Sequence, residues 1–176
     1  MKILVIDDSA VHQESARKTL EGHDLTIVGT YDEAMSLFGL HKMPWRLKEK
    51  ERQPQEFDAV LTDLLMPAGM GGLGGAGEQY IGQEMPMGFP LVLMAVLKSS
   101  AKYLAVVSDT SHHDHPAAYA LSRLVGYSNK DRPLFTINGA IVGFYSSGHG
   151  ALQTSVSGFE QPGKNWGAVL SNLFDE

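Results

Sequence analysis

The chain has 176 residues, of which 43% are hydrophobic and 19% are charged, a balance that excludes an intrinsically disordered protein. Lys and Arg number 14 against 20 Asp and Glu, which gives a net charge of −6 at pH 7. This charge disfavours nucleic acid and anionic membranes as partners, because both are polyanionic. Cysteine is absent, so disulfides, thiolate metal sites and cysteine nucleophiles are excluded.

No targeting or membrane-spanning segment is predicted. Asp7 and Asp8 interrupt the first apolar stretch too early for a signal peptide. The longest apolar run, residues 89–97, falls short of the roughly 20 residues that cross a bilayer, and it predicts a buried helix. We therefore expect a cytoplasmic protein with no membrane partner.

Five short apolar runs predict β-strands at residues 3–6, 25–28, 59–61, 104–107 and 140–145. Most are rich in Val and Ile, which is typical of strands buried on both faces of a parallel sheet. Helical patterns separate and follow them, at residues 9–22, 32–38, 91–103, 116–125 and 166–174. The alternation predicts an α/β fold in which a doubly wound five-stranded parallel sheet forms the middle of three layers, α/β/α.

Two stretches interrupt this alternation and are predicted as insertions within a single domain of residues 1–176. Residues 41–56 are charged and contain two prolines. Residues 68–88 are crowded with glycine and methionine, which predicts a long flexible loop. The last strand is open to a second interpretation: a hairpin around Asn138-Gly139 would add an antiparallel strand at the sheet edge.

Three carboxylates stand at the carboxyl ends of predicted strands. Asp7 and Asp8 close the first strand, and Asp63 closes the third. If these strands are neighbours, the carboxylates converge at the edge where such sheets bind ligands. Three carboxylates repel one another unless a cation is present, and oxygen ligands suit Mg²⁺ or Mn²⁺. The simpler alternative, that each aspartate caps the following helix, is less favoured because all three occupy matching positions.

Two stretches resemble the receiver domain of two-component response regulators: Lys-Ile-Leu-Val-Ile-Asp-Asp-Ser at 2–9 and Phe-Asp-Ala-Val-Leu-Thr-Asp-Leu-Leu-Met-Pro at 57–67. The resemblance implies a flavodoxin-like fold with Asp63 as phosphoacceptor. It implies a Mg²⁺ or Mn²⁺ site formed by Asp7, Asp8, Asp63 and the carbonyl of Leu65. In Val-Val-Ser-Asp-Thr, it assigns the phosphoryl-binding hydroxyl to Ser108.

The function that the resemblance implies is that of a stand-alone response regulator in a Mg-dependent phosphorelay. A histidine kinase or small phosphodonor would supply the phosphoryl group, and a downstream protein would read the signal. The chain would be a phosphoacceptor rather than an enzyme that turns over substrate, and homodimer formation is compatible with this role. The alternatives are a degenerate receiver that acts as a phosphorylation-independent interaction module, and a small metal-dependent hydrolase.

The lysine that receivers carry after their fifth strand has no plain counterpart. Aligning Gly139-Ala140 with the family's pattern places Ser146 there, so that the pocket would lack a lysine. Lys130, in Asn-Lys-Asp-Arg-Pro, is the rival candidate, but it would leave the β-like residues 134–145 unused. We prefer the alignment with Ser146, because serine there keeps the fifth strand intact.

A histidine cluster follows the fourth predicted strand in Asp-Thr-Ser-His-His-Asp-His. His112, His113 and His115, with neighbouring carboxylates, form a plausible transition-metal set and would serve the hydrolase alternative. The favoured interpretation is a polar loop that caps the helix beginning at Pro116. A third is that one histidine takes the place of the missing lysine.

Overall fold

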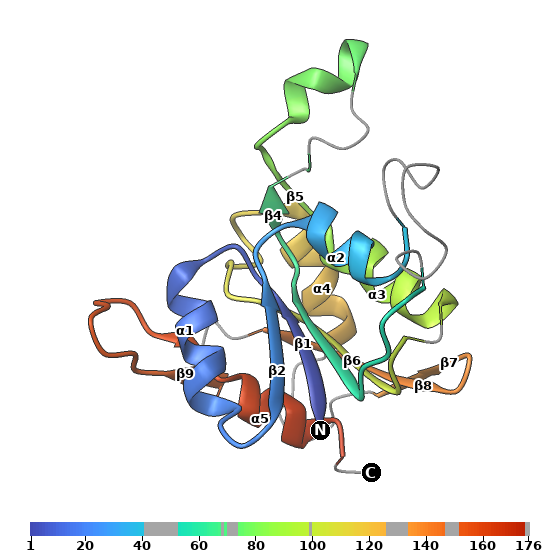
Figure 1. Ribbon diagram of the computed structural model, residues 1–176. Coiled ribbons are helices and arrows are strands. Elements are labelled where there is room, and N and C mark those ends of the chain that lie inside the picture. The colour runs from blue at the N-terminus through green and yellow to red at the C-terminus, as the bar shows by residue number, and fades with distance from the viewer. Residues whose placement is uncertain are drawn as a thin grey trace.

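The computed structural model describes residues 1–40, 53–67, 69, 74–98, 100–125, 134–146 and 152–174. The protein is an α/β fold with a mostly parallel six-stranded central sheet flanked by helices (Figure 1). The sheet has the strand order β2-β1-β3-β6-β8-β7. Its strands are β1 (Lys2–Ile6), β2 (Asp24–Val28), β3 (Ala59–Asp63), β6 (Tyr103–Ser108), β7 (Phe135–Ile137) and β8 (Ala140–Ser146).

All five predicted strands are present and parallel, but the prediction of five strands in the sheet is wrong. The sixth strand, β7, pairs antiparallel with β8 at the edge of the sheet. The turn between them places Asn138 and Gly139 at φ values of 50° and 80°. Asn-Gly tolerates this conformation and closes a two-residue hairpin, as the alternative interpretation predicted.

Each face of the sheet has its own apolar core, because successive side chains of a strand point to opposite faces. Ile3 and Val5 of β1 face α1 (Ala10–Thr19) and α5 (Trp166–Asn172). Leu4 and Ile6 face the other core, which the remaining helices cover. These are α2 (Tyr31–Leu37), α3 (Gly88–Leu97) and α4 (Pro116–Val125).

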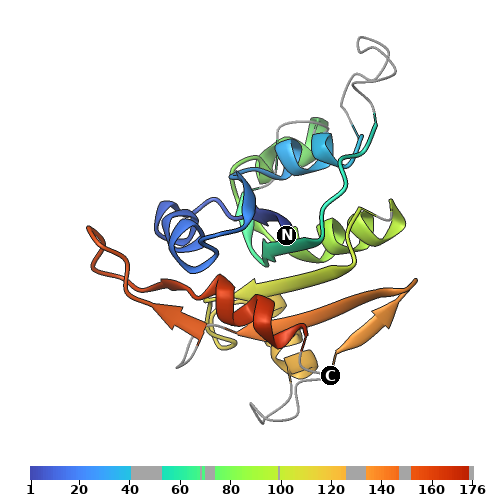
Figure 2. The ribbon, with the colours of Figure 1, turned by 60° about the horizontal axis from the view of Figure 1, so that its bottom comes forward.

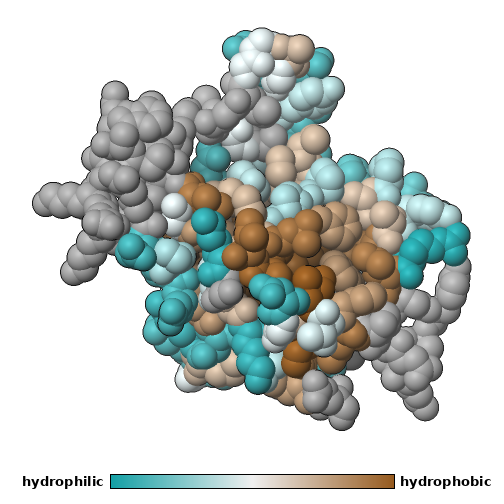
Figure 3. Space-filling model, turned by 90° about the vertical axis from the view of Figure 1, so that its right-hand side faces the viewer, coloured by the Kyte–Doolittle hydropathy of each residue, from teal (hydrophilic) through white to brown (hydrophobic). Residues whose placement is uncertain are grey.

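Helix α3 is shorter and less buried than predicted. It ends at Leu97 rather than at residue 103, and the N–H of Ser100 closes it on the carbonyl of Ala95. One side packs into the core, but Leu93 and Leu97 are 58% and 69% exposed. Figure 3 shows apolar side chains gathered over this side of the molecule. The apolar composition of residues 89–97 therefore does not bury the helix all round.

Two small hairpins extend from the central body (Figures 1 and 2). The first pairs β4 (Met66–Pro67) with β5 (Glu84–Met85) and contains the 3₁₀ helix η3 (Gly75–Tyr80), so part of the predicted 68–88 loop is regular. The second pairs β9 (Gln153–Thr154) with β10 (Gly163–Lys164) between β8 and α5. Most of the other predicted insertion, residues 41–52, lies outside the described residues.

Candidate functional site: an acidic pocket with a buried lysine

The register of the sheet brings the predicted carboxylates together. Ile6 of β1 pairs with Thr62 of β3, so Asp7 and Asp63 are the next residues along two adjacent strands. Oxygen atoms of Asp7, Asp8 and Asp63 all lie within 4.8 Å of one another. Asp7 and Asp63 are buried, whereas Asp8 is exposed at the pocket's mouth. The predicted acidic pocket therefore exists at the carboxyl edge of the sheet.

A lysine fills the pocket, contrary to the sequence-based prediction. The Nζ atom of Lys164 lies 2.7 Å from Oδ2 of Asp7 and 2.8 Å from Oδ1 of Asp63. Its side chain is completely buried. Ser146 does end β8 in register with Ser108, but the cation comes from the β9–β10 hairpin. Lys130, the rival candidate, lies outside the described residues.

Helix α1 holds the backbone of Lys164 in place. The Ser15 hydroxyl donates a hydrogen bond to the Lys164 carbonyl, and the Lys164 N–H donates to Nδ1 of His12 at 3.3 Å. The indole Nε1 of Trp166 donates to the carbonyl of His12 at 3.0 Å. Both polar groups of the Lys164 peptide are thus bonded to one helix, which fixes the position from which the side chain reaches the carboxylates.

Gly163 allows this close approach of β10 to α1. A Cβ atom built at this position would lie 2.5 Å from Cβ of Ser15 and 3.0 Å from Cγ2 of Val156. We predict that Gly163→Ala lowers the free energy of unfolding by about 1–3 kcal/mol, because β10 must move away from α1. Urea denaturation measures this loss. Gly74→Ala is the control, since a Cβ there meets nothing within 4 Å; equal stability of the two variants would contradict the packing argument.

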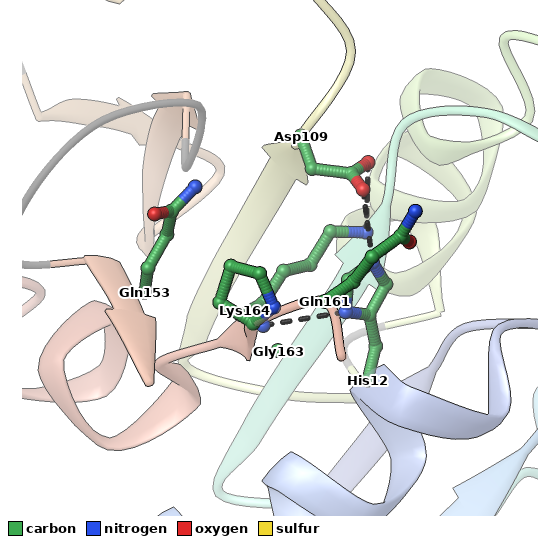
Figure 4. A pocket seen from close by; sticks show the side chains of 7 residues that line it. His12, Asp109, Gln153, Gln161, Gly163 and Lys164 are labelled. Carbon is green, nitrogen blue, oxygen red and sulfur yellow. Dashed lines mark hydrogen bonds and ion pairs between the residues drawn. The ribbon is translucent and has the colours of Figure 1, made fainter. Parts of the chain in front are cut away.

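His12 joins the lysine to a further carboxylate. Because Nδ1 of His12 accepts from the Lys164 N–H, a single ring proton must reside on Nε2. That atom lies 3.0 Å from Oδ2 of Asp109 and therefore donates to it. Oδ1 of Asp109 lies 3.8 Å from Nζ of Lys164. The neutral imidazole thus satisfies both neighbours and directs Asp109 toward the lysine (Figure 4).

The pKa values of the pocket reflect burial and crowding of negative charge. Burial raises the pKa of Asp63 to about 7, and the charges of Asp7 and Asp109 act in the same direction against Lys164. Burial and Asp7 also raise the pKa of Asp8. Burial alone would lower the pKa of Lys164, but the carboxylates of Asp63, Asp7 and Asp109 raise it above its ordinary value. The lysine therefore stays charged.

Asp109 differs from the other carboxylates. The hydrogen bond from His12 holds the pKa of Asp109 well below its usual range, although partial burial opposes this shift. Asp109 is consequently an anion at neutral pH. Four carboxyl groups and one ammonium share a small volume, and ionisation of all four carboxyl groups would leave negative charge in excess.

An excess of negative charge in the pocket would favour the binding of a divalent cation. Within the described ranges, Asp7, Asp8 and Asp63 are the one group of three side chains whose ligand atoms lie close enough to hold a metal ion. All their ligand atoms are carboxylate oxygens, which suit Mg²⁺ or Mn²⁺. Asp8 is the one with an exposed side chain and would offer the entry to the site.

The other predicted site residues lie around this pocket. Ser108 ends β6 one residue beyond Val107, the partner of Asp63, and is buried, and its Oγ accepts from the N–H of Thr110 at 3.2 Å. Leu65 lies buried two residues beyond Asp63, directly before β4. Ser108 and Asp63 therefore lie at the same carboxyl edge of the sheet, on adjacent strands.

The histidine cluster does not assemble as a three-ligand site in the described part of the chain. The rings of His112 and His113 lie side by side, with centroids 3.9 Å apart. The Nδ1 atom of His115 instead accepts a hydrogen bond from the N–H of Ala117 in the first turn of α4. This contact agrees with the favoured interpretation of a loop that caps the helix.

Sequence reasoning missed Lys164 and the role of His12. One signal pointed to the lysine: it is the only Lys or Arg after Arg132. It also directly precedes Asn165, which caps α5 by accepting from the N–H of Ala168. His12 had no such signal, because its partners lie 97 and 152 positions away in the chain.

None of the helices in the described ranges is both long and apolar enough to cross a membrane. Comparison of the chain with models of protein families, with curated proteins and with solved structures finds no match.

Proposed function

We propose that the chain is a receiver-like module that accepts a phosphoryl group on Asp63. The contact of Lys164 with Asp7 and Asp63 carries this proposal, because it sets a buried cation beside a buried nucleophile. The order of the five parallel strands, β2-β1-β3-β6-β8, is that of flavodoxin-like doubly wound sheets, which bind ligands at this edge.

Each residue of the pocket has a role in this reaction. Leu64 N and Lys164 Nζ both contact Oδ1 of Asp63, which leaves Oδ2 as the attacking oxygen. Lys164 would pair with the phosphoryl oxygens, and the hydroxyl of Ser108 would donate to one of them. Magnesium held by Asp7, Asp8 and Asp63, with the Leu65 carbonyl, would offset the charge between donor and acceptor. A histidine kinase or small phosphodonor supplies the group, and a downstream protein reads the result.

The test is phosphorylation of the purified protein. With Mg²⁺ and a small phosphodonor, we expect intact mass spectrometry to show the addition of one phosphoryl group to the wild type and none to Asp63→Asn. Asp24→Asn, an exposed carboxylate at the start of β2, is the control and should behave as the wild type. A phosphorylated Asp63→Asn protein would refute the assignment of the acceptor.

The metal site has its own test. Mg²⁺ should raise the melting temperature of the wild type, because a ligand that binds only the folded state stabilises it. Asp8→Asn should abolish this increase, since Asp8 is the exposed member of the set. If a well-folded Asp8→Asn protein is still stabilised by Mg²⁺, the metal lies elsewhere.

A further inference from the structure

The outward half of helix α3 is entirely apolar. A helix that buries one face in a core normally carries polar or charged residues on its opposite face, as α1 does with exposed Glu14, Arg17 and Lys18. In α3, the residues that are not buried are Phe89, Pro90, Leu93, Met94 and Leu97. We call these five residues the apolar face of α3. Leu93 and Leu97 are its most exposed members, so packing within the chain does not cover this face.

The apolar face of α3 continues onto the edge of the central sheet. The ring centroid of Phe89 lies 6.0 Å from that of Phe144 in β8, and the centroid of Phe144 lies 5.5 Å from that of Phe135 in β7. All three rings are only partly buried. Figure 3 shows a broad area of apolar side chains on this side of the molecule. A contiguous exposed area of this kind is typical of an interaction site.

The occupant of this face must itself be apolar, because none of the five side chains carries a charge. A membrane fits poorly. Ten residues of helix span about 15 Å, which is half of the hydrocarbon core of a bilayer. The opposite face of α3 packs into the protein core, so the helix has no basic face to meet lipid headgroups. A protein surface fits better.

The two ends of α3 differ in charge. The helix begins at the carboxyl edge of the sheet, where the N–H of Gly88 donates to the carbonyl of Leu64. Exposed carboxylates lie at this end, in β5 and in the first turn of the neighbouring α2: Glu84, Asp32 and Glu33. The charged residues closest in sequence to the other end are Lys98 and Lys102, and both are exposed. The apolar face therefore lies between an acidic end and a basic end.

We propose that a second copy of this chain docks on the apolar face of α3, with the two helices antiparallel about a twofold axis near Leu93. A twofold axis presents the same surface from both copies, so one uncharged apolar face meets another. The antiparallel arrangement brings Lys98 of each copy toward the acidic end of α3 in the other. A parallel arrangement would set like charges side by side, which disfavours it. Since a ten-residue helix offers less than the roughly 1,600 Å² of a standard interface, the dimer is weak and reversible.

The first experiment is sedimentation velocity of the purified protein over a series of concentrations that reaches the millimolar range. We expect a monomer–dimer equilibrium in the wild type. Leu97→Glu should raise the dissociation constant at least about tenfold, because the dimer would bury an unpaired charge. The melting temperature should stay the same, since Leu97 is 69% exposed. Leu93→Glu is a second variant of the same kind. Phe159→Glu adds the same charge at an exposed aromatic residue of the β9–β10 hairpin, and it should dimerise as the wild type does.

The charges at the helix ends have a separate test. Lys98→Glu should raise the dissociation constant several-fold in dilute buffer, because acidic groups would then face one another. This difference should disappear in concentrated salt, which screens exposed charges. Arg17→Glu is the matched control, because it reverses an exposed cation of α1, which covers the other face of the sheet.

Single cysteines report the arrangement of the two helices, because the natural chain has no cysteine. Leu93→Cys lies near the proposed axis and should form a disulfide-linked dimer under mild oxidation. Leu97 lies about 6 Å further along the helix, so two copies of Leu97→Cys would be about 12 Å apart along an antiparallel pair. A disulfide spans at most about 7 Å between Cα atoms, so Leu97→Cys should cross-link far more slowly.

Each contrary result has a definite meaning. A wild type that is monomeric at every concentration would refute the dimer. An interface that survives both glutamate substitutions in α3, or that Phe159→Glu weakens equally, would not be the apolar face of α3. Equal cross-linking of the two cysteine variants would refute the antiparallel arrangement. Binding of the monomer to vesicles of zwitterionic lipid, lost in Leu97→Glu, would assign the face to a membrane instead. None of these measurements depends on phosphorylation, so the proposed function of Asp63 is tested independently.

Discussion

Replacing Lys164 with methionine is expected to lower the free energy of unfolding by about 3–5 kcal/mol at pH 8, because the change removes one partner of a buried ion pair. Lys164 and Asp7 are completely buried and Asp63 nearly so, and methionine fills the space without the charge. Two buried carboxylates then face each other without a cation. Urea denaturation followed by the fluorescence of Trp166, whose ring lies 5.6 Å from Nζ, measures the loss.

The loss should shrink as the pH falls. Without the lysine, the folded state relieves the repulsion by binding a proton, which becomes easier in acid. Lys102→Met is the matched control, because Lys102 is exposed and lies just before β6, at the opposite end of that strand from the pocket. If Lys164→Met costs less than about 1 kcal/mol at pH 8, as expected for a surface lysine, the pocket does not depend on this ion pair.

Asp63→Asn is expected to remove a pH dependence of stability in the metal-free protein. The folded pKa of Asp63 is raised from 3.8 to about 7. Between these values the folded state binds more protons than the unfolded state, so stability falls as the pH rises through this window. At 1.36 kcal/mol per pKa unit, the contribution of Asp63 has an upper limit of roughly 4 kcal/mol. Asparagine does not titrate, so this part of the slope disappears.

Asp109 does not obscure this measurement. Its pKa is lowered, so its contribution is fully present above its ordinary value of 3.8 and is lost only at lower pH. Free energies of unfolding measured in EDTA between pH 4.5 and 8 therefore isolate the carboxylates with raised pKa values. If the free energy of unfolding varies with pH in the same way for the wild type and for Asp63→Asn, the pKa of Asp63 is not raised in the folded state.

The parallel strands and the acidic pocket were predictable because their signals are local. A short run of Val and Ile is typical of a strand that is buried on both faces of a parallel sheet. An aspartate directly after such a run lies at the carboxyl end of that strand. Asp7 and Asp63 therefore needed only the adjacency of β1 and β3 to meet. The antiparallel strand β7 was also predictable, because Asn138-Gly139 favours the tight turn of a two-residue β-hairpin.

The lysine was not predictable by the same reasoning, because its place is set by tertiary contacts. Alignment to the end of β8 led to Ser146, and Ser146 is indeed there. The chain then continues into the β9–β10 hairpin before Lys164 enters the pocket. No periodicity marks this detour, since β9 and β10 have two residues each. Contacts with α1 hold β10 in place. An alignment of the central strands alone contains no information on these contacts.

The route of Lys164 also has a consequence for the order in which the protein is assembled during synthesis. All six strands of the central sheet precede residue 147, so the carboxylates of Asp7 and Asp63 can meet before the ribosome has added their cation. The ion pair spans 157 positions of the chain. A chain that ends after β8 carries both carboxylates without this cation, and β10 supplies it. Docking of the hairpin on α1 joins the first helix of the sequence to a segment about 150 positions later, and contacts of such long sequence separation are expected to form slowly.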